Sequence, residues 1–510
     1  MNAPQDSATP NAAKRNLAAL GVMLVIFLFA IDATIVSTAM PTIVAKLGGL
    51  ELYSWVFSIY MLTSALTTPV FGKLADLFNR RRLMLVGIAV FVLGSILCGA
   101  AQSMEALVLF RAIQGLGGGA IYALSFIVVG VLYPPEKRAK MQGVISGIWG
   151  VAAILGPLAG GLIVEHMSWR WAFFVNLPIT AVAVGLIVVG LKETSRQRSA
   201  HKLDFAGTFT LLSALLLLFY GLSHSAQAKQ PFNAELAVMI ALAVFFLAVF
   251  YFIERRAAEP IIPLELFHLR LFKTSAAVAT IAAMGAFGAI SYLPLYLQGV
   301  TGLTASRAGM VLLFLSFAWT VGSLIAGQAL NRFGYRAVAA AGMALMTVGY
   351  SLFVVFQSEL SVFWVAIGGT LIGTGMGMAN LTTLVSVQNS VAHQRIGVAT
   401  STIMLFRTFG GAFAVSLMGT VLLNQMQRGL GRLSGSGLPA ALLDKLAQPQ
   451  NLLEPATRLQ IPPELLPRLI AILGDAVWFA FATGFALMIV GVALSLLMAS
   501  STPAETREHV

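Results

Sequence analysis

The stretch GKLADLFNRRR, Gly72 to Arg82, lies between two apolar runs and carries the pattern that decides the fold. The runs cover about 54–71 and 83–101, close to the ~20 apolar residues with which a helix crosses a hydrocarbon core of about 30 Å. A related stretch, GQALNRFGYR, Gly327 to Arg336, follows 255 residues later between two further apolar runs. We therefore expect membrane helices joined by a short charged loop, in an arrangement that occurs twice.

Composition assigns the whole chain to a membrane. Of its 510 residues, 58% are hydrophobic and 10% are charged, whereas soluble domains carry about 25% charged residues. The first apolar run is too long for a signal peptide and lacks a small-residue cleavage site before the next run, so we expect it to be retained as a helix. No sizeable water-soluble domain is predicted.

Several function classes lack their sequence signals. The net charge of +12 comes from basic residues scattered over short loops, which argues against nucleic-acid binding. A single cysteine, Cys98, excludes an intramolecular disulfide or a cysteine-based metal cluster. We find neither a phosphate-binding G-x-x-x-x-G-K-[ST] loop nor an H-E-x-x-H zinc motif, and the glycine-rich GLGGGA lies in an apolar helix. We expect no metal, no cofactor and no enzyme activity.

The apolar runs predict fourteen spanning helices and an all-α polytopic membrane protein. They cover about 17–41, 54–71, 83–101, 106–130, 140–164, 171–191, 204–223, 236–253, 275–298, 308–328, 337–356, 362–388, 397–423 and 474–499. An even number puts both termini on one side, and 21 Lys/Arg lie on that side against nine on the other. Positive residues favour the cytoplasm, so both termini are predicted to be cytoplasmic.

Two further pairs of stretches extend the internal repeat. IQGLGGG from Ile113 matches LIGTGMG from Leu371, and GVISGIWGVAAILGP from Gly143 aligns with GVATSTIMLFRTFGG from Gly397, at offsets of 258 and 254. The repeat predicts a six-helix bundle over 1–200, two inserted helices over 201–256, and a second bundle over 257–510. The second bundle includes a long external loop, 424–474, in which PPELLPRLIAIL predicts a short interfacial helix.

The two copies differ in their charged and helix-breaking residues. At these offsets four residues of the first half correspond to uncharged or smaller residues of the second: Asp32 to Gly285, Asp76 to Asn331, Arg111 to Gly369 and Pro157 to Gly411. The functional charges are therefore expected in the first half.

Six stretches carry a resemblance to the major facilitator superfamily. GKLADLFNRRR resembles its loop motif between helices 2 and 3, RAIQGLGGGA from Arg111 its helix 4 motif, and GIWGVAAILGPLAGG from Gly147 the helix 5 motif typical of antiporters. The fourteen-helix drug:proton antiporter branch is similar in AIDATIVSTAMPTI from Ala30, WRWAFFVNLPI from Trp169 and LDFAGTF from Leu203. The resemblance covers essentially the whole chain.

The resemblance implies a proton-coupled multidrug exporter that works by alternating access. Its partners would be lipophilic neutral or cationic small molecules, protons and membrane lipids, and the proton gradient would replace a cofactor. It implies a monomer in a bacterial cytoplasmic (inner) membrane. Two alternatives stay open: an exporter of a specific lipid, siderophore or metabolite with the same fold, and a receptor or scaffold that no longer transports.

Asp32 and Arg111 are the candidate proton-coupling residues. A charged aspartate inside a membrane helix costs about 2.5–3.5 kcal/mol on insertion scales, so such residues normally face a cavity or a partner. Helix geometry gives both residues a similar depth. The arginine stays charged and favours the carboxylate, whereas burial favours the neutral acid. The alternatives are an aspartate that only orders its helix and an arginine tied to backbone carbonyls.

A candidate cytoplasmic gate follows the second helix, with four members: Gly72, Asp76, Arg80 and Arg81. A carboxylate there can cap a helix end or pair with the arginines, giving a latch that holds one state. The alternative is a plain positive-inside cluster, which explains the arginines but neither Gly72 nor Asp76.

Helix 5 is the candidate antiporter hinge. Its small and helix-breaking residues include Gly147, Gly156, Pro157 and Gly160. Small residues allow close approach of helices, and proline supplies a kink. We expect this helix to be a tightly packed hinge between the halves.

A substrate cavity should combine aromatic and polar residues. The candidates are Tyr60, Gln114, Tyr122, Trp149, Asn176, Tyr292, Tyr296, Trp319, Asn380, Gln388 and Arg407. For Arg407 an anionic substrate, a helix carbonyl and a carboxylate are all open as partners. Each of the others could instead face lipid or pack in the core.

Overall fold

Every regular element that the structure describes is a helix. The structure is a computed structural model, and it describes residues 12–48, 52–191, 204–227, 234–257, 260, 262–356, 361–432, 446 and 460–502. Helices satisfy all their backbone polar groups internally, which is what a lipid environment demands. Within these residues, 11 helices are long and apolar enough to cross a membrane.

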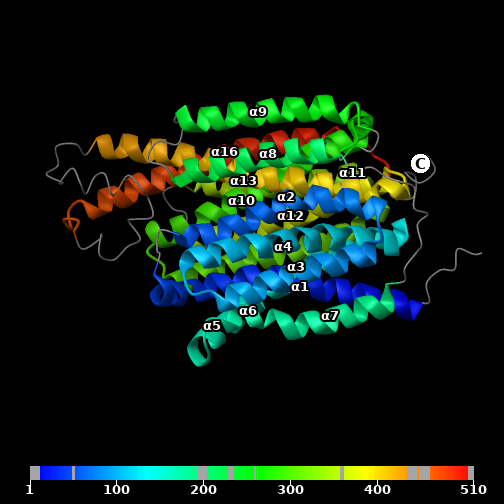
Figure 1. The fold of residues 1–510 in the computed structure, drawn as a ribbon. Helices are drawn as coiled ribbons and strands as arrows, with labels where there is room; N and C mark the ends of the chain where they lie inside the picture. Colours follow the sequence, from blue (N-terminus) through cyan, green and yellow to red (C-terminus); the bar gives the residue numbers. More distant parts are fainter. Residues whose placement is uncertain are drawn as a thin grey trace, which may run out of the picture. The chain divides into compact units, whose positions relative to one another are not determined.

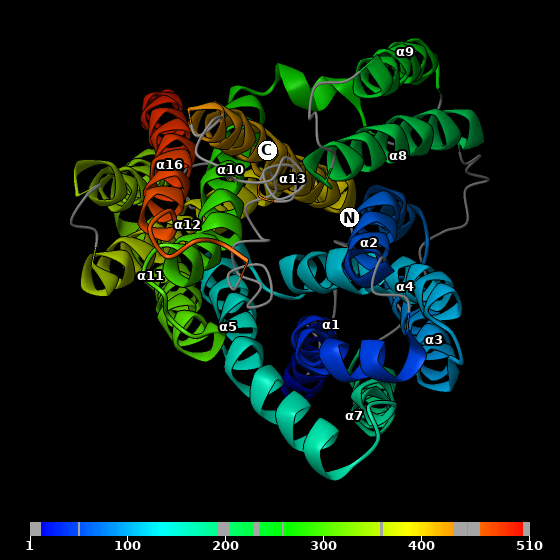
Figure 2. The same cartoon turned by 90° about the vertical axis from the view of Figure 1, so that its left-hand side faces the viewer.

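The chain divides into two compact units, drawn in Figures 1 and 2. The first comprises Met1–Asp204, Ala257–Pro263 and Val391–Thr402. Its helices are α1 (Ala12–Leu47), α2 (Tyr53–Leu77), α3 (Arg80–Ala100), α4 (Met104–Leu132), α5 (Pro135–His166), α6 (Trp171–Phe174), α7 (Asn176–Gly190) and η3 (His393–Arg395), with the first turns of α13 (Ile396–Gly431).

The second unit comprises Phe205–Arg256, Leu264–Ser390 and Ile403–Val510. Its helices are α8 (Phe205–Gln227), α9 (Ala234–Glu254), η2 (Leu264–His268), α10 (Arg270–Gly299), α11 (Ala305–Val355), α12 (Val362–Asn389), the rest of α13, and α16 (Leu466–Leu496). The predicted inserted pair coincides with α8 and α9, which pack against each other and belong to this unit.

Each of the fourteen predicted spans falls on a helix of the structure. Two of them lie in α11, which is broken at Gly334 by a left-handed backbone conformation (φ 74°) that glycine adopts without strain. One span is divided into α6 and α7, which are separated by Val175 alone.

The external segment of the second half differs from the prediction. Helix α13 continues to Gly431, and α16 already begins at Leu466 with Pro467 in its first turn. The prediction of a separate short interfacial helix is therefore wrong, because Leu466–Leu473 of that segment form the first turns of α16 and Pro462–Leu465 precede them. A proline is well tolerated at a helix start, so Pro467 does not separate this segment from the rest of α16. Residues 433–445 and 447–459 of the predicted loop lie outside the described residues.

Glycine contacts repeat between the two units. A side chain at Gly94 of α3 would meet Gln114 of α4, and one at Gly349 of α11 would meet Ile372 of α12. These residues correspond at the sequence offsets of 255 and 258. The same close helix pairing is thus built twice, as small residues allow in membrane helices.

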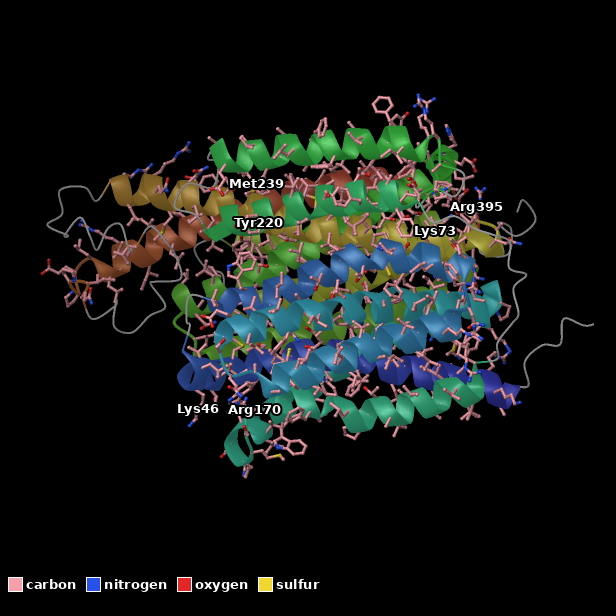
Figure 3. All side chains as sticks on the ribbon, in the orientation of Figure 1. Lys46, Lys73, Arg170, Tyr220, Met239 and Arg395 are labelled. Atoms are coloured by element: carbon pink, nitrogen blue, oxygen red, sulfur yellow. The ribbon has the colours of Figure 1, made fainter. Side chains whose placement is uncertain are left out.

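Two packing relations in the first unit position its polar residues. Helix α1 packs against α4, α5 and α7, and α4 packs against α2 and α3 (Figure 2). In Figure 3, Lys73 and Arg395, predicted to be cytoplasmic, lie at one end of this unit. Lys46 and Arg170, predicted to be external, lie at the opposite end.

Candidate functional site

The core of the first unit contains a buried ion pair. Arg111 Nη1 of α4 donates to Asp32 Oδ2 of α1 at 2.6 Å. Both side chains are shielded from solvent, with exposed fractions of 1% and 0%. Breaking such a pair by removing one partner is costly, because it leaves an uncompensated buried charge. The structure thus brings together the two residues predicted to couple protons.

Gln114 bridges the two members of this pair. Its Nε2 donates to Asp32 Oδ1 at 2.8 Å, and its Oε1 accepts from Arg111 Nη1 at 2.8 Å. Because Gln114 lies one helical turn after Arg111 on α4, both side chains reach α1 from the same helix face. Gln114, predicted to line the substrate cavity, therefore contacts both members of the ion pair.

Asn176, also predicted for the cavity, provides a third donor to Asp32. Its Nδ2 lies 3.0 Å from Asp32 Oδ1 and 2.9 Å from Ser95 Oγ. Ser95 in turn donates to the backbone carbonyl of Phe173 in α6, at 2.9 Å. The start of α7 and the end of α6 are thereby tied through Ser95 of α3 to the Asp32 carboxylate.

Two groups on α2 complete the environment of Arg111. Its Nε donates to the carbonyl oxygen of Val56 at 3.2 Å, and its guanidinium lies 4.0 Å from the centroid of the Tyr60 ring. A guanidinium over an aromatic face is stabilised by the ring quadrupole, most strongly where water is excluded. Arg111 therefore keeps two partners that do not depend on the charge of Asp32.

This arrangement suits a carboxyl group that gains and loses a proton. Asp32 receives donors on both oxygens, which satisfies the charged form. If a proton neutralises the carboxylate, Arg111 loses its counter-ion but retains the Val56 carbonyl and the Tyr60 ring. A site of this kind can exist in two protonation states without a metal or cofactor. Among the described residues, no three His, Cys, Asp or Glu side chains form a cluster suited to a metal ion.

An aromatic cluster adjoins the ion pair through Tyr60. Phe29 of α1 contacts the rings of Tyr60, Tyr122 and Trp149 at centroid distances of 5.8, 5.4 and 5.7 Å. Tyr122 of α4 and Trp149 of α5 also contact each other edge to face at 6.3 Å. A continuous aromatic surface, here called the aromatic cluster (Phe29, Tyr60, Tyr122 and Trp149), thus leads from Arg111 to α5.

At the other candidate position, Asp76 caps the start of α13. Its Oδ1 and Oδ2 accept from the backbone N–H groups of Gly397 and Val398, at 2.9 and 2.8 Å. A carboxylate at a helix N-terminus satisfies free N–H groups and complements the helix dipole. All three residues belong to the first unit, in which only the first turns of α13 are included.

Gly72 and the two arginines lie near this cap. A side chain at Gly72 would overlap Ser401 of α13, so glycine permits the close approach of α2. Arg80 Nη2 lies 3.7 Å from Asp76 Oδ1, one helical turn away in sequence. Arg81 is half-buried at the start of α3.

Two glycines of α5 allow this helix to pack closely against α1. A Cβ at Gly156 would overlap Thr34 of α1, and one at Gly160 would lie 2.9 Å from Thr38 of the same helix. These contacts lie within the first unit, where α1 and α5 pack against each other. Gly147 is half-buried in α5; Pro157 lies within the helix, and its side chain is outside the described part.

The remaining cavity candidates are dispersed in the second unit. Arg407 of α13 donates to the Asn380 carbonyl and to Thr383 Oγ1 (3.3 Å) of α12, so a helix carbonyl is one of its partners. Tyr292 donates to the Val415 carbonyl at 2.5 Å. Tyr296 contacts the Phe481 ring. Gln388 is buried in α12, and Trp319 is half-buried in α11.

Sequence reasoning missed three members of the site: Ser95, Cys98 and Phe29. Cys98 Sγ lies 3.6 Å from Gln114 Oε1 and acts as a weak donor to it. A small polar residue in an apolar run gives little signal on its own. The internal repeat could have indicated Ser95, because the residue at the corresponding position of the second half, 255 residues later, is the much larger Tyr350.

Comparison with known proteins gives a consistent result. The family model described as Major Facilitator Superfamily matches residues 22–415. The Multidrug transporter protein MdtP of Bacillus subtilis (strain 168) is 34% identical over 508 residues, covering 95% of this chain and 93% of that protein. Multidrug resistance protein 3 of the same organism is 32% identical, with 99% of each chain covered.

Solved structures share the fold at low sequence identity. The human organic anion transporter MFSD10 (TETRAN) aligns with a TM-score of 0.64 at 15% identity, covering 94% of this chain and 99% of that one. A bacterial homologue of the human lysosomal transporter Spinster, in an inward-facing and occupied conformation, aligns with a TM-score of 0.58 at 16% identity, covering 96% and 97%.

Proposed function

Because the chain belongs to the major facilitator superfamily, we propose that it is a multidrug efflux antiporter that exchanges a proton for a lipophilic compound. The names of the Bacillus subtilis relatives support drug export as the activity. The buried Asp32–Arg111 pair is the observation that carries proton coupling, because intramembrane ionisable groups in transporters commonly form proton relays.

The exchange uses two states of Asp32. In the charged state, Asp32 holds Arg111 through the 2.6 Å ion pair. A proton from the external side neutralises Asp32 and releases the arginine to Tyr60 and the Val56 carbonyl. Loss of the proton to the cytoplasm restores the pair. The difference in binding energy between the two states can bias a conformational equilibrium, as ligand-driven switches require.

The Asp76 cap acts as the cytoplasmic latch in this proposal. It holds the first turn of α13 by two charge-assisted hydrogen bonds to backbone N–H groups. Residues Gly72, Arg80 and Arg81 contribute close packing and a compensating charge in the same region.

Lipophilic compounds would bind first at the aromatic cluster. Its rings offer apolar area and π-faces that attract organic cations, and Tyr60 connects them to Arg111. Tyr292, Tyr296 and Arg407 of the second unit stay candidate substrate contacts. We place the protein in the bacterial cytoplasmic membrane with both termini in the cytoplasm, on the Lys/Arg distribution.

Transport in proteoliposomes tests this function. Wild-type protein is reconstituted, loaded with a lipophilic fluorescent monocation, and exposed to an imposed pH gradient. We expect efflux that rises with the gradient and disappears when a protonophore removes it. Efflux unaffected by the gradient would exclude proton coupling. Failure of a panel of neutral and cationic drugs, together with movement of a lipid or metabolite, would favour the specific-exporter alternative.

A further inference from the structure

One polar atom beside Asp32 has no role in the charged network. The Oδ1 of Asn176 is buried and receives no hydrogen bond from the described residues. The Nδ2 of the same amide donates to both Asp32 and Ser95. Buried polar atoms are rarely left without a partner, so an unused acceptor on the amide that contacts Asp32 requires a physical explanation.

The two protonation states of a carboxyl group need different partners. A charged Asp32 only accepts, and Arg111, Gln114 and Asn176 supply the donors. A protonated Asp32 carries an O–H group that must donate to an acceptor, because a buried donor without one is costly. The donor groups that surround charged Asp32 cannot accept a hydrogen bond from the O–H group of protonated Asp32.

The other nearby acceptors are already occupied. Gln114 Oε1 accepts from Arg111 and Cys98, and the Val56 carbonyl accepts from Arg111. Ser95 Oγ accepts from Asn176 while donating to a backbone carbonyl. The Tyr60 hydroxyl has no partner in the described part of the chain, but it lies toward Gly118, within 3.1 Å of where a Cβ would stand.

We propose that Asn176 is the residue that receives the hydrogen bond of protonated Asp32, an inference that rests on the proposed proton coupling. A half-turn of the amide about its Cβ–Cγ bond replaces Nδ2 by Oδ1 opposite the Asp32 carboxyl group. The proton comes from external water, remains on Asp32 as O–H, and leaves to cytoplasmic water. Asn176 forms only a hydrogen bond and is a positioning residue.

The half-turn has a consequence for α7. Asn176 is the first residue of α7, and its Nδ2 links it to Ser95, which also binds the Phe173 carbonyl of α6. Turning the amide releases the bond to Ser95. The protonation state of Asp32 would thus reach the α6–α7 junction through one side chain.

Three ionisable groups face Asp32 in the described structure: Arg111 from α4, Tyr60 from α2 and Cys98 from α3. Arg111 is the charged member of this set, while Tyr60 and Cys98 are neutral at their ordinary pKa values. The neutral amide of Asn176 in α7 therefore contributes most to the protonated state of Asp32.

Difference infrared spectroscopy of the purified protein tests the inference. Spectra at acidic and alkaline pH are subtracted, and the C=O band of a protonated carboxyl group is assigned to Asp32 by its absence from Asp32→Asn. In Asn176→Leu, which has a similar volume but no acceptor, we expect this band at a higher wavenumber. Thr180→Val is the matched control, because Thr180 is buried one turn later on α7 and donates to the Asn176 carbonyl.

A flux measurement accompanies the spectra. We expect Asn176→Leu to lower gradient-driven efflux by about fivefold, as the loss of one hydrogen bond implies, while substrate exchange without a gradient is retained. If Asn176→Leu does not fold, Asn176→Ala serves in both experiments. An Asp32 band unchanged in the Asn176 variant would overturn the inference and leave the proposed function intact. A wild-type protein without any Asp32 band would instead contradict the proposed function itself.

Discussion

The first unit has Asp32 on α1 where the second has Gly285 on α10, and the space around the two residues is filled in opposite ways. Asp32 is surrounded by Arg111, Gln114 and Asn176. A side chain at Gly285 would meet Met488 and Met346, whose flexible thioethers fill irregular apolar gaps. One helix scaffold thus supports charged surroundings at Asp32 and apolar surroundings at Gly285.

The hydroxyl groups of the two units show the same divergence. Ser95 corresponds to Tyr350 at the offset of 255. Ser95 belongs to the Asp32 network, whereas Tyr350 donates to the Gly285 carbonyl at 2.6 Å. The glycine contacts between helices are shared, but the polar groups are not. Packing is therefore common to both units, while the buried Asp32–Arg111 pair lies in the first.

The largest effect is expected from Arg111→Leu. Removing one partner of a buried pair costs about 3–5 kcal/mol of stability, because Asp32 is left as an uncompensated buried charge. We expect gradient-driven efflux to fall by more than about 100-fold, because Asp32 loses the counter-ion with which its two states are exchanged. The fall is measured by comparing efflux from proteoliposomes that contain the wild-type protein or the variant.

A double variant is the control for stability. Replacing both members, Asp32→Leu with Arg111→Leu, should restore the thermal stability that the single change loses, without restoring coupling, because an apolar pair leaves no buried charge. Gradient-driven efflux in Arg111→Leu at the wild-type rate would show that the ion pair is structural only, and the distinction between the two units would lose its functional meaning.

An intermediate effect is expected from Gln114→Leu, compared with Ile372→Leu at the equivalent position of the second unit. Gln114 makes hydrogen bonds to both members of the ion pair, and each bond to a charged group is worth about 1.5–3 kcal/mol. We expect a roughly tenfold or greater loss of gradient-driven efflux for Gln114→Leu and less than about twofold for Ile372→Leu. Equal losses in the two variants would indicate packing as their common cause.

The smallest effect should come from removing one hydroxyl group in each unit. Ser95→Ala deletes the bonds of the hydroxyl to the Phe173 carbonyl and to Asn176, whereas Tyr350→Phe deletes the bond to the Gly285 carbonyl; each bond is worth about 1 kcal/mol of stability. We expect a larger drop in thermal stability for Ser95→Ala than for Tyr350→Phe, and a changed pH profile of efflux only for Ser95→Ala. A changed pH profile in Tyr350→Phe would place proton chemistry in the second unit as well.

Much of the fold could be predicted because a segment that crosses the hydrocarbon core of a membrane must be apolar along its length. Apolar runs must be helices, so the spans and their order follow from run length. The start of α16 could not be predicted, because an amphipathic segment continues a helix as readily as it forms a separate one. Offsets between repeated glycines predicted equivalent helix pairs, and those contacts recur in both units.

The candidate site was less accessible to sequence reasoning. Helix geometry gave Asp32 and Arg111 a similar depth, since depth depends only on distance along a helix. It did not assign Gln114 and Asn176 to Asp32, because a polar residue in a spanning helix gives the same signal whether it faces a cavity or another side chain. The partners of Asp76 are 321 and 322 residues away, beyond any local pattern.

Proton release on substrate binding tests the central claim most directly. Purified protein in weakly buffered solution is mixed with a lipophilic monocation, and a pH indicator records the protons released by wild type and by Asp32→Asn. The account predicts release of about one proton per bound substrate in wild type and none in Asp32→Asn, with binding retained in both. Equal release from the two proteins would contradict it, because the exchanged proton would then belong to another residue.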